Sequence, residues 1–331
     1  MTKKVKYLLI IAIIIFIGFL GYQILKSNKS ADNQSQAKKV SLRLKWIGQA
    51  QFAGFYLANK YGLYADSGLE VDIKPGGPDV SPVQMVVSGV NDFGITGADQ
   101  IILAREKGVP IVALAVIYKD SPVAIGSLKE NNIIVPKDLE GKRVGVVYGR
   151  DEETIYRALL KKEGVDSEKI EEVPVLAGIS QMTTKKFDAQ ILYEINEAIL
   201  LEQNGFAVNL IKPRDYGITF YADTLFTTEE MIRDYPDTVK AFVRVSITGW
   251  EKALANPEEA VEETLRINSS LDKEHQRKFF NASIPLIRGA GRIGQFEKKV
   301  WGYMQEILLG QQLLKNPINL DQAFTNEFLD Q

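Results

Sequence analysis

Aromatic, amide, hydroxyl and carboxylate side chains recur along this chain where a predicted strand gives way to a predicted helix or loop. Aromatic faces can stack on a flat ring, and amide or carboxylate groups can form directed hydrogen bonds with the edge of that ring. Backbone N–H groups also converge where a helix begins. The residues at these junctions are therefore our candidates for binding a small molecule. They are Trp46, Gln49, Gln51, Phe52, Tyr56, Thr96, Gly97, Asp99, Tyr118, Ser121, Glu152, Tyr193, Asn196, Glu197 and Asp223.

Several candidates also have a purely structural interpretation. An apolar alternation or a helical spacing of four residues is typical of the core, and a polar residue at a helix start often only caps it. The core interpretation applies to Trp46, Phe52 and Tyr56, and the capping or helix-charge interpretation applies to Asp99, Glu152 and Asn196.

The composition excludes several kinds of catalytic and metal site. The chain of 331 residues contains no cysteine and one histidine, which rules out thiolate nucleophiles, iron–sulfur centres and multi-histidine metal sites. That histidine, His275, lies in a dense run of charges and is predicted to occupy a solvated helix face. Residues 289–294 fit G-x-G-x-x-G without a preceding strand, so we interpret them as a turn between helices. No cofactor or metal is predicted, and a formal charge of −2 gives no reason to expect a nucleic-acid partner.

The N-terminal residues indicate a membrane segment. Residues 7–25 carry no charge, lie between Lys6 and Lys26, and would span roughly 28 Å as a helix. Two interpretations are open: a retained single-pass anchor within residues 1–26, or a signal peptide that is cleaved. In either case we expect an extracytoplasmic body, held at the cell membrane or released as a secreted or periplasmic protein. Residues 27–39 are polar and are predicted to form a flexible tether.

The body alternates strand and helix patterns twice. Residues 40–46 alternate apolar and polar side chains, which predicts an opening strand, and residues 81–84 combine a capping box with a first-turn proline. The same alternation restarts after residues 123–127, with a helix expected over residues 152–163. Two such units predict an α/β protein with two parallel-sheet lobes and a cleft between them.

Five stretches of the body resemble a known family of solute-binding proteins. They are residues 44–79, which begin LKWIGQAQFAGFYLANKYG, residues 93–116, residues 138–146 (DLEGKRVGV), residues 193–205 (YEINEAILLEQNG) and residues 216–228 (YGITFYADTLFTT). The family groups these binders with thiamine-pyrimidine synthases and aliphatic-sulfonate binders. The most similar members are linked to the uptake of thiamine pyrimidine precursors and riboflavin.

The resemblance implies a type II periplasmic-binding-protein fold, in which two αβ lobes flank a hinge cleft, preceded here by an N-terminal transmembrane helix. The first lobe would begin with residues 40–125, the second would comprise residues 126–215, and residues 216–331 would return to the first lobe and add C-terminal helices. The crossings would fall near residues 123–127 and 216–222. A ligand would lie in the cleft, outside the carboxyl ends of parallel strands, and closure would trap it.

The resemblance also implies a small planar nitrogen heterocycle as ligand, and the permease and ATPase of an ABC importer as partners. Gln49, Tyr193 and Glu197 are the most informative candidates, because they lie in the family-like motifs at strand-to-helix junctions. A carboxylate such as Glu197 can accept hydrogen bonds from an aminopyrimidine edge. One alternative is a thiamine pyrimidine synthase-like enzyme. It is disfavoured because such enzymes consume a histidine of their own chain together with pyridoxal phosphate, and carry a cysteine-rich motif. The other alternative is a sensory ectodomain with the same cleft.

Overall fold

The structure is a computed structural model that describes residues 37–175 and 178–329. The predicted membrane segment, residues 1–26, and most of the predicted tether, residues 27–39, lie outside these ranges. Within the two described ranges, no helix is both long and apolar enough to cross a bilayer.

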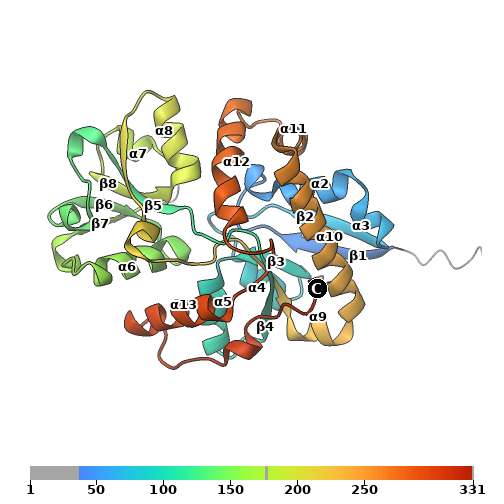
Figure 1. The fold of residues 1–331 in the computed structure, drawn as a ribbon. Coiled ribbons are helices and arrows are strands. Elements are labelled where there is room, and N and C mark those ends of the chain that lie inside the picture. The colour runs from blue at the N-terminus through green and yellow to red at the C-terminus, as the bar shows by residue number, and fades with distance from the viewer. Residues whose placement is uncertain (1–36, 176–177, 330–331) are drawn as a thin grey trace, which may run out of the picture. The chain divides into compact units, whose positions relative to one another are not determined.

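The first sheet has five strands in the order β2-β1-β3-β10-β4 (Figure 1). Strand β4 is an unbroken apolar run, IVALAV, and every residue in it is buried, as expected for a strand covered on both faces. Helix α4 begins as the capping pattern predicts, because the Ser81 side chain accepts a hydrogen bond from the backbone of Gln84. The elements of this part are β1 (Lys38–Arg43), α2 (Ala53–Lys60), α3 (Leu63–Asp66), β2 (Leu69–Lys74), α4 (Pro82–Val87), β3 (Phe93–Thr96), α5 (Ala98–Glu106), β4 (Ile111–Val116) and β10 (Thr224–Thr228).

The second sheet also has five strands, in the order β7-β6-β8-β5-β9. Helix α6 carries three acidic residues in its first turn and two lysines in its last, which complements the helix dipole. A short π-helical turn, η5 (Glu194–Ala198), follows β8 directly. The other elements are β5 (Val123–Leu128), β6 (Arg143–Val146), α6 (Asp151–Lys162), β7 (Glu171–Pro174), α7 (Ser180–Thr183), β8 (Ala189–Tyr193), α8 (Ile199–Gln203) and β9 (Val208–Ile211).

The prediction of two parallel sheets is wrong for one strand in each. Strand β10 runs antiparallel to its neighbours β3 and β4, and β5 runs antiparallel to β8 and β9. Both are the first strands after the chain changes sheet. A segment that has just arrived from the other sheet must run away from it, whereas strands such as β4 run toward the crossing. The predicted crossing at residues 123–127 coincides with β5, so the chain changes sheet between β4 and β5.

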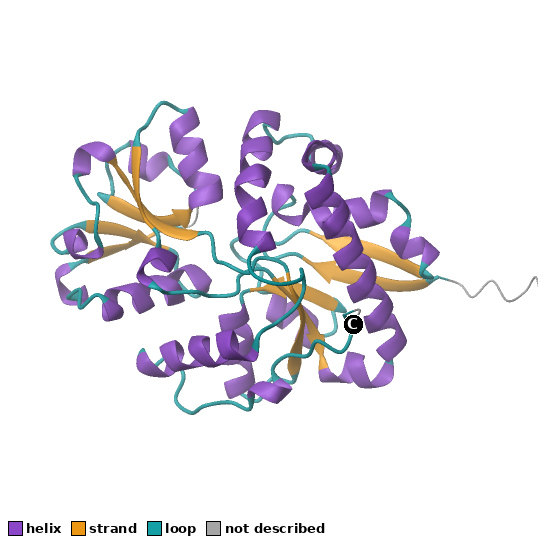
Figure 2. Cartoon of the chain, viewed as in Figure 1, coloured by secondary structure: helices purple, strands orange, loops and turns teal. Residues whose placement is uncertain are grey.

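The C-terminal helices pack mainly on the first sheet and its helices (Figures 1 and 2). Helix α10 lies against α2, where the Phe55 ring meets the edge of Trp250 at 5.7 Å between centroids. The glycine-rich run after α12 is a loop with positive φ at Gly289, Gly291 and Gly294, which fits the predicted turn between helices. The helices are α9 (Glu229–Asp234), α10 (Pro236–Ala255), α11 (Pro257–Ile267), α12 (Lys273–Arg288) and α13 (Lys298–Gly310).

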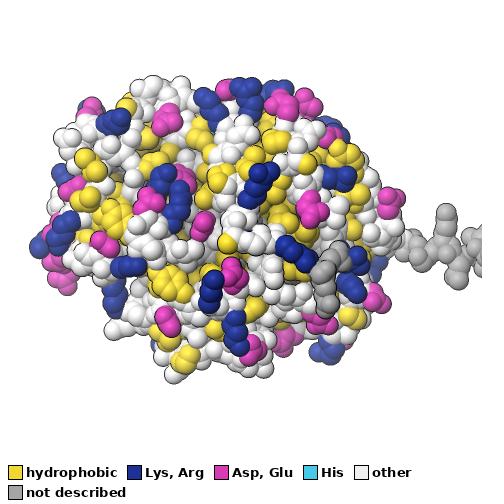
Figure 3. Space-filling view, viewed as in Figure 1, with side chains coloured by type: hydrophobic (Ala, Val, Ile, Leu, Met, Phe, Trp, Pro, Cys, Tyr) yellow, Lys and Arg dark blue, Asp and Glu magenta, His cyan; other side chains and the backbone are white. Residues whose placement is uncertain are grey.

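Below, the first lobe means the first sheet with the helices packed on it, and the second lobe means the second sheet with α6, α7, η5 and α8. On the face shown in Figure 3, acidic and basic side chains are interspersed, and neither sign forms an extended patch. This face therefore offers no large single-sign field that would attract a polyanion.

Candidate ligand-binding site

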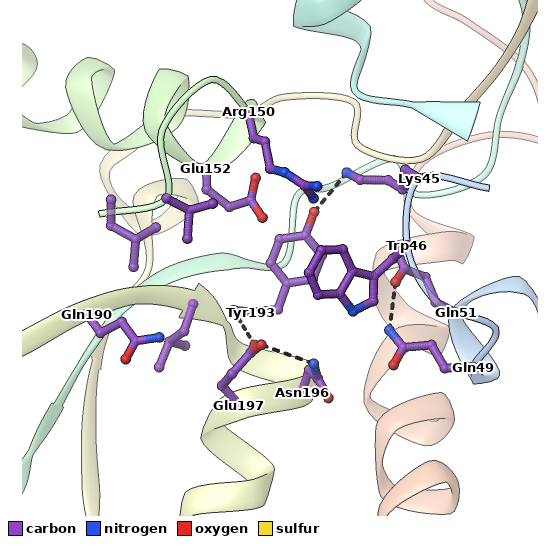
Figure 4. Close-up of a pocket in the computed structure, with 13 residues that line it drawn as sticks. Lys45, Trp46, Gln49, Gln51, Arg150, Glu152, Gln190, Tyr193, Asn196 and Glu197 are labelled. Atoms are coloured by element: carbon purple, nitrogen blue, oxygen red, sulfur yellow. Dashed lines mark hydrogen bonds between the residues drawn. The ribbon is translucent and has the colours of Figure 1, made fainter. Parts of the chain in front are cut away.

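A cavity lies where the carboxyl ends of β1, β6 and β8 meet, and both lobes line it (Figure 4). We call it the ligand cavity. This is the position at which open α/β sheets hold ligands. The first lobe contributes Lys45, Trp46, Gln49 and Gln51, and the second lobe contributes Val147, Arg150, Glu152, Gln190, Ile191, Leu192, Tyr193, Asn196 and Glu197.

Two aromatic side chains, one from each lobe, face this cavity. Trp46 follows β1 and is only partly buried, so the structure does not place it in the core. Tyr193 ends β8. The Arg150 guanidinium lies 4.9 Å from the centroid of the Trp46 ring, and the Lys45 ammonium lies 5.6 Å from that of Tyr193. The cavity thus combines aromatic surface with nearby charge.

A buried group of four side chains joins the lobes at the edge of the cavity. We call Lys45, Asp151, Tyr193 and Asp223 the interlobe cluster. Lys45 Nζ donates to both oxygens of Asp151 at 3.0 and 3.1 Å and to the Tyr193 hydroxyl at 2.9 Å, and it lies 3.7 Å from Asp223. The Tyr193 hydroxyl donates to Asp151 at 3.1 Å. Lys45 and Asp223 belong to the first lobe and the other two to the second, so these bonds hold the lobes together.

Carboxyl groups outnumber the cation in this region. Burial raises the pKa of Asp223 to about 6 against the lowering effect of Lys45, and burial together with Asp151 raises that of Asp99 to about 6. For Asp151, burial acts in the opposite direction, but Lys45 and hydrogen bonds bring its pKa below the ordinary value. The cluster is therefore short of positive charge when all its carboxyl groups are ionised.

Two acceptor atoms beside the ligand cavity are buried without a hydrogen-bond partner among the described residues. They are Oε2 of Glu152 and Oε1 of Gln190. Gln190 is held in this orientation because its Nε2 donates to the Gly178 carbonyl at 3.0 Å. Burial, with the charge of Asp151, raises the pKa of Glu152 well above its usual range. A buried acceptor left unpaired costs about 1–3 kcal/mol, so Oε1 of Gln190 favours a ligand that brings a hydrogen-bond donor. The raised pKa of Glu152 favours its protonated form, which can donate a hydrogen bond as well as accept one.

Glu197 is the second acidic group that lines the cavity, and its orientation is fixed by hydrogen bonds. It accepts hydrogen bonds from the Tyr193 backbone at 3.1 Å and from Asn196 Nδ2 at 3.2 Å. Burial raises its pKa. Figure 4 shows Glu197 between these two partners, on the same side of the cavity as Gln190.

The structure brings together seven of the fifteen predicted residues at the ligand cavity: Trp46, Gln49, Gln51, Glu152, Tyr193, Asn196 and Glu197. Thr96 lies beside it, in a neighbouring cavity of about 520 Å³ that shares Lys45 and Arg150. Asp223 accepts from Gln51 and pairs with Lys45, so it supports the site from behind.

The remaining candidates take structural positions away from the cavity. Phe52 is fully buried in the core, and Tyr56 faces a separate cavity beside Asn59. Gly97 and Asp99 are packed behind Thr96, where Gly97 leaves room for Asp151. The Tyr118 ring meets the edge of Trp250, and the Ser121 hydroxyl accepts from the backbone of Val123. A place at a strand end fixes the region of a residue but not the direction of its side chain.

Sequence reasoning missed Lys45, Arg150, Asp151 and Gln190. Lys45 occupies the polar half of the β1 alternation and therefore resembled a solvent-facing residue, yet it is 7 % exposed. The acidic triplet at residues 151–153 was the one available signal for Asp151.

The prediction for His275 is wrong. Its side chain is 8 % exposed and bonds Asn196 and Gln203 of the second lobe. Asp272 caps α12 and sets its rotation, so that His275, Phe279 and Phe280 fall on the buried face. A histidine therefore does lie near the cleft, one residue behind Asn196, although His275 does not itself line the ligand cavity.

Comparison with known proteins gives consistent matches across the body. Residues 49–260 match the model of a protein family described as NMT1/THI5 like. The chain is 28% identical over 309 residues to riboflavin-binding protein RibY of Chloroflexus aurantiacus, covering 89% of this chain and 87% of that protein. It is 25% identical over 325 residues to the formylaminopyrimidine-binding protein of Halalkalibacterium halodurans, covering 96% and 98%.

The fold is shared with solved periplasmic-binding structures. The periplasmic aliphatic sulphonate binding protein SsuA from Escherichia coli superposes with a TM-score of 0.69 at 16% identity, covering 86% of this chain and 91% of that chain. The two lobes described above are those of this fold.

Proposed function

Because this chain belongs to the NMT1/THI5-like family and has the two-lobe periplasmic-binding fold, we propose that it is an extracytoplasmic solute-binding protein of an ABC importer. Its ligand would be a small, flat nitrogen heterocycle that carries amino groups. The names of the two relatives, a riboflavin binder and a formylaminopyrimidine binder, support this class of solute. The permease, its ATPase and attachment to the membrane belong to the same proposal.

The unpaired acceptors of the ligand cavity carry the choice of ligand. An exocyclic amino group on a heteroaromatic ring supplies two N–H donors beside a flat face, which fits Oε1 of Gln190 next to Trp46 and Tyr193. A protonated Glu152 can accept from the same amino group and donate to a neighbouring ring nitrogen. Glu197 provides a further acceptor. An anionic sulfonate suits the cavity less well, because it would face two carboxyl groups while both cations of the cavity already have partners. Lys45 bonds Asp151 and Tyr193, and Arg150 donates to the carbonyls of Gly77 and Pro78.

The size of the cavity favours one ring over several. Its volume is about 40 Å³, whereas the neighbouring cavity measures about 520 Å³. The ligand cavity therefore suits a single flat ring better than the three fused rings of a flavin. Lys45 and Arg150 line both cavities, so the larger one lies beside it and has room for a substituent on that ring.

Titration of the purified full-length chain tests the proposal. We expect saturable binding of 4-amino-5-hydroxymethyl-2-methylpyrimidine, followed by calorimetry and by the fluorescence of Trp46, with weaker binding of riboflavin and none of ethanesulfonate. Glu152→Gln and Trp46→Ala should each weaken binding about tenfold or more. Glu153→Gln is the matched control, because Glu153 caps the backbone of Gly149 and does not line the cavity.

Absence of saturable binding to all three compounds would refute the proposal. Unchanged affinity in Glu152→Gln would refute the assignment of the donor-bearing ligand. The enzyme alternative is less favoured, because the chain has no cysteine and its one histidine does not line the ligand cavity.

A further inference from the structure

A chain of hydrogen bonds leads from the first lobe to the ligand cavity through the only histidine of the protein. His275 Nε2 lies 2.9 Å from Oδ1 of Asn196, and Nδ2 of Asn196 donates to Glu197 at 3.2 Å. Glu197 in turn accepts from the Tyr193 backbone. Asn196 and Glu197 both line the ligand cavity, whereas His275 stands one step behind them.

The two neighbours His275 and Gln276 face opposite lobes. Gln276 accepts a hydrogen bond from the backbone of Ala50 at 2.8 Å in the first lobe, while His275 bonds Asn196 and Gln203 in the second. Helix α12 accordingly packs against α11 on one side and against η5 and α8 on the other. The bond from His275 to Asn196 therefore exists only while the lobes are together.

The donor in this bond follows from the amide of Asn196. Because Nδ2 of Asn196 donates to the Glu197 carboxylate, its Oδ1 is the atom that faces His275, and Nε2 of the imidazole must carry the hydrogen. The other ring nitrogen, Nδ1, lies 2.8 Å from Oε1 of Gln203, so both ring nitrogens face an oxygen acceptor as the side chains are placed. Burial lowers the pKa of His275, which favours a neutral ring that accepts at Nδ1 after the Gln203 amide turns.

We propose that His275 is a positioning residue that completes the ligand site when the lobes close. It fixes Asn196, and Asn196 directs the Glu197 carboxylate toward the donors of the ligand. Asn196 and Glu197 lie on η5, a π-helical turn, which is a rare local geometry that often occurs at functional sites. With the lobes apart, Asn196 and Glu197 lose this support, so the second lobe alone would bind the ligand weakly. This inference rests on the proposed function.

The first test measures affinity for 4-amino-5-hydroxymethyl-2-methylpyrimidine in the full-length chain. His275→Phe keeps the ring, which meets the edge of Phe279 at 6.4 Å, but removes the donor, and we expect about tenfold weaker binding. The alternative substitution His275→Gln retains an N–H donor, so its affinity should lie within about threefold of that of the wild type. Arg277→Ala, an exposed position on the same helix, is the control and should leave affinity unchanged.

A double-mutant cycle separates positioning from a general loss of structure. In an Asn196→Ala background, His275→Phe should weaken binding by less than about twofold, because the partner through which it acts is gone. Equal effects of His275→Phe in both backgrounds, or failure of His275→Gln to restore binding, would overturn the proposal.

A ligand-free measurement keeps this inference distinct from the proposed function. Since there is one histidine, its imidazole nitrogen signals need no assignment in a long-range ¹⁵N NMR spectrum. The interlobe cluster holds the lobes together without a ligand, so the contact is expected in the ligand-free protein. We expect a neutral ring protonated at Nε2, with signals that move on Asn196→Ala and do not move on Arg277→Ala. Imidazole signals that stay in place on Asn196→Ala would refute the hydrogen bond between His275 and Asn196, whether or not the wild type binds any of the compounds.

Discussion

The isosteric substitution Asp223→Asn should remove one pH-dependent contribution to the free energy of unfolding. Asp223 is 2 % exposed, accepts from Gln51 Nε2 through both oxygens at 2.9 and 3.1 Å, and lies 3.7 Å from Lys45 Nζ. Two opposing effects act on its charge. Burial penalises the ionised form, and Lys45 favours it.

The direction of the pKa shift decides which effect prevails. The pKa of Asp223 rises from 3.8 to about 6, with burial as the main cause. Between these two pH values the folded protein binds more protons than the unfolded chain, so this group makes the wild type less stable as the pH increases. A difference of about two pH units at about 1.4 kcal/mol each amounts to about 3 kcal/mol, complete above the folded pKa.

Asparagine has the same shape and no charge, so Asp223→Asn should remove this dependence. At pH 4 the two proteins should differ by no more than about 1 kcal/mol, the value of one hydrogen bond. Between pH 4 and pH 8 the free energy of unfolding of the variant should rise relative to the wild type by about 3 kcal/mol. Other titrating groups are common to both proteins and largely cancel in this difference.

Urea unfolding at pH 4, 5, 6, 7 and 8, followed by tryptophan fluorescence, measures the difference in unfolding free energy between Asp223→Asn and the wild type. Parallel stability profiles of the two proteins would refute the reasoning, because Asp223 would then have an ordinary pKa. A variant that becomes relatively less stable as the pH rises would show that the attraction to Lys45 outweighs the cost of burial.

Two further substitutions test the contact between the lobes. Lys45→Met leaves Asp151 buried without its cation and should lower the free energy of unfolding by about 3–5 kcal/mol at pH 7.5. The loss should be smaller at pH 5, because the carboxyl groups take up protons there. Urea unfolding at the two pH values checks this. Gly97→Ala would place a Cβ against Oδ1 of Asp99 and 3.1 Å from Cβ of Asp151, which belongs to the other lobe. It should therefore weaken ligand affinity with little change in melting temperature. An unchanged dissociation constant would contradict the close approach of the two lobes at Gly97. By contrast, Gly249→Ala would collide with the Gly54 carbonyl between α10 and α2, and should lower the unfolding free energy by about 1–3 kcal/mol while calorimetry shows unaltered binding.

Local patterns predicted most elements of the fold, because the signals they use are short-range. The helix expected over residues 152–163 is α6, displaced by one residue, and the predicted cap of α4 is present as the hydrogen bond from the Gln84 backbone to the Ser81 hydroxyl. Strand direction was less accessible. Nothing in the pattern of residues 123–127 distinguishes a crossing from the antiparallel strand β5, since pairing depends on β8 and β9, more than sixty residues later.

The location of the candidate site follows from one rule: residues at the carboxyl ends of parallel strands lie close together in the fold. That rule selected Trp46, Tyr193 and Glu197, which line one cavity in the structure. It could not find Lys45, whose partner Asp151 is 106 positions away, because a buried charge is recognisable only once its counter-charge is known. His275 shows the same limit, since its charged neighbours along the chain suggested solvent while its rotation on α12 points it to Asn196.

The placement of β10 between β3 and β4 has a consequence for the order in which the chain assembles during synthesis. All five strands of the second sheet lie within residues 123–211, so that sheet can form as soon as this stretch leaves the ribosome. The first sheet has a gap at its centre until residues 224–228 arrive. We therefore expect the second lobe to fold first during synthesis. The first sheet, although its earlier strands are made before those of the second, would stay incomplete until β10 pairs with β3 and β4.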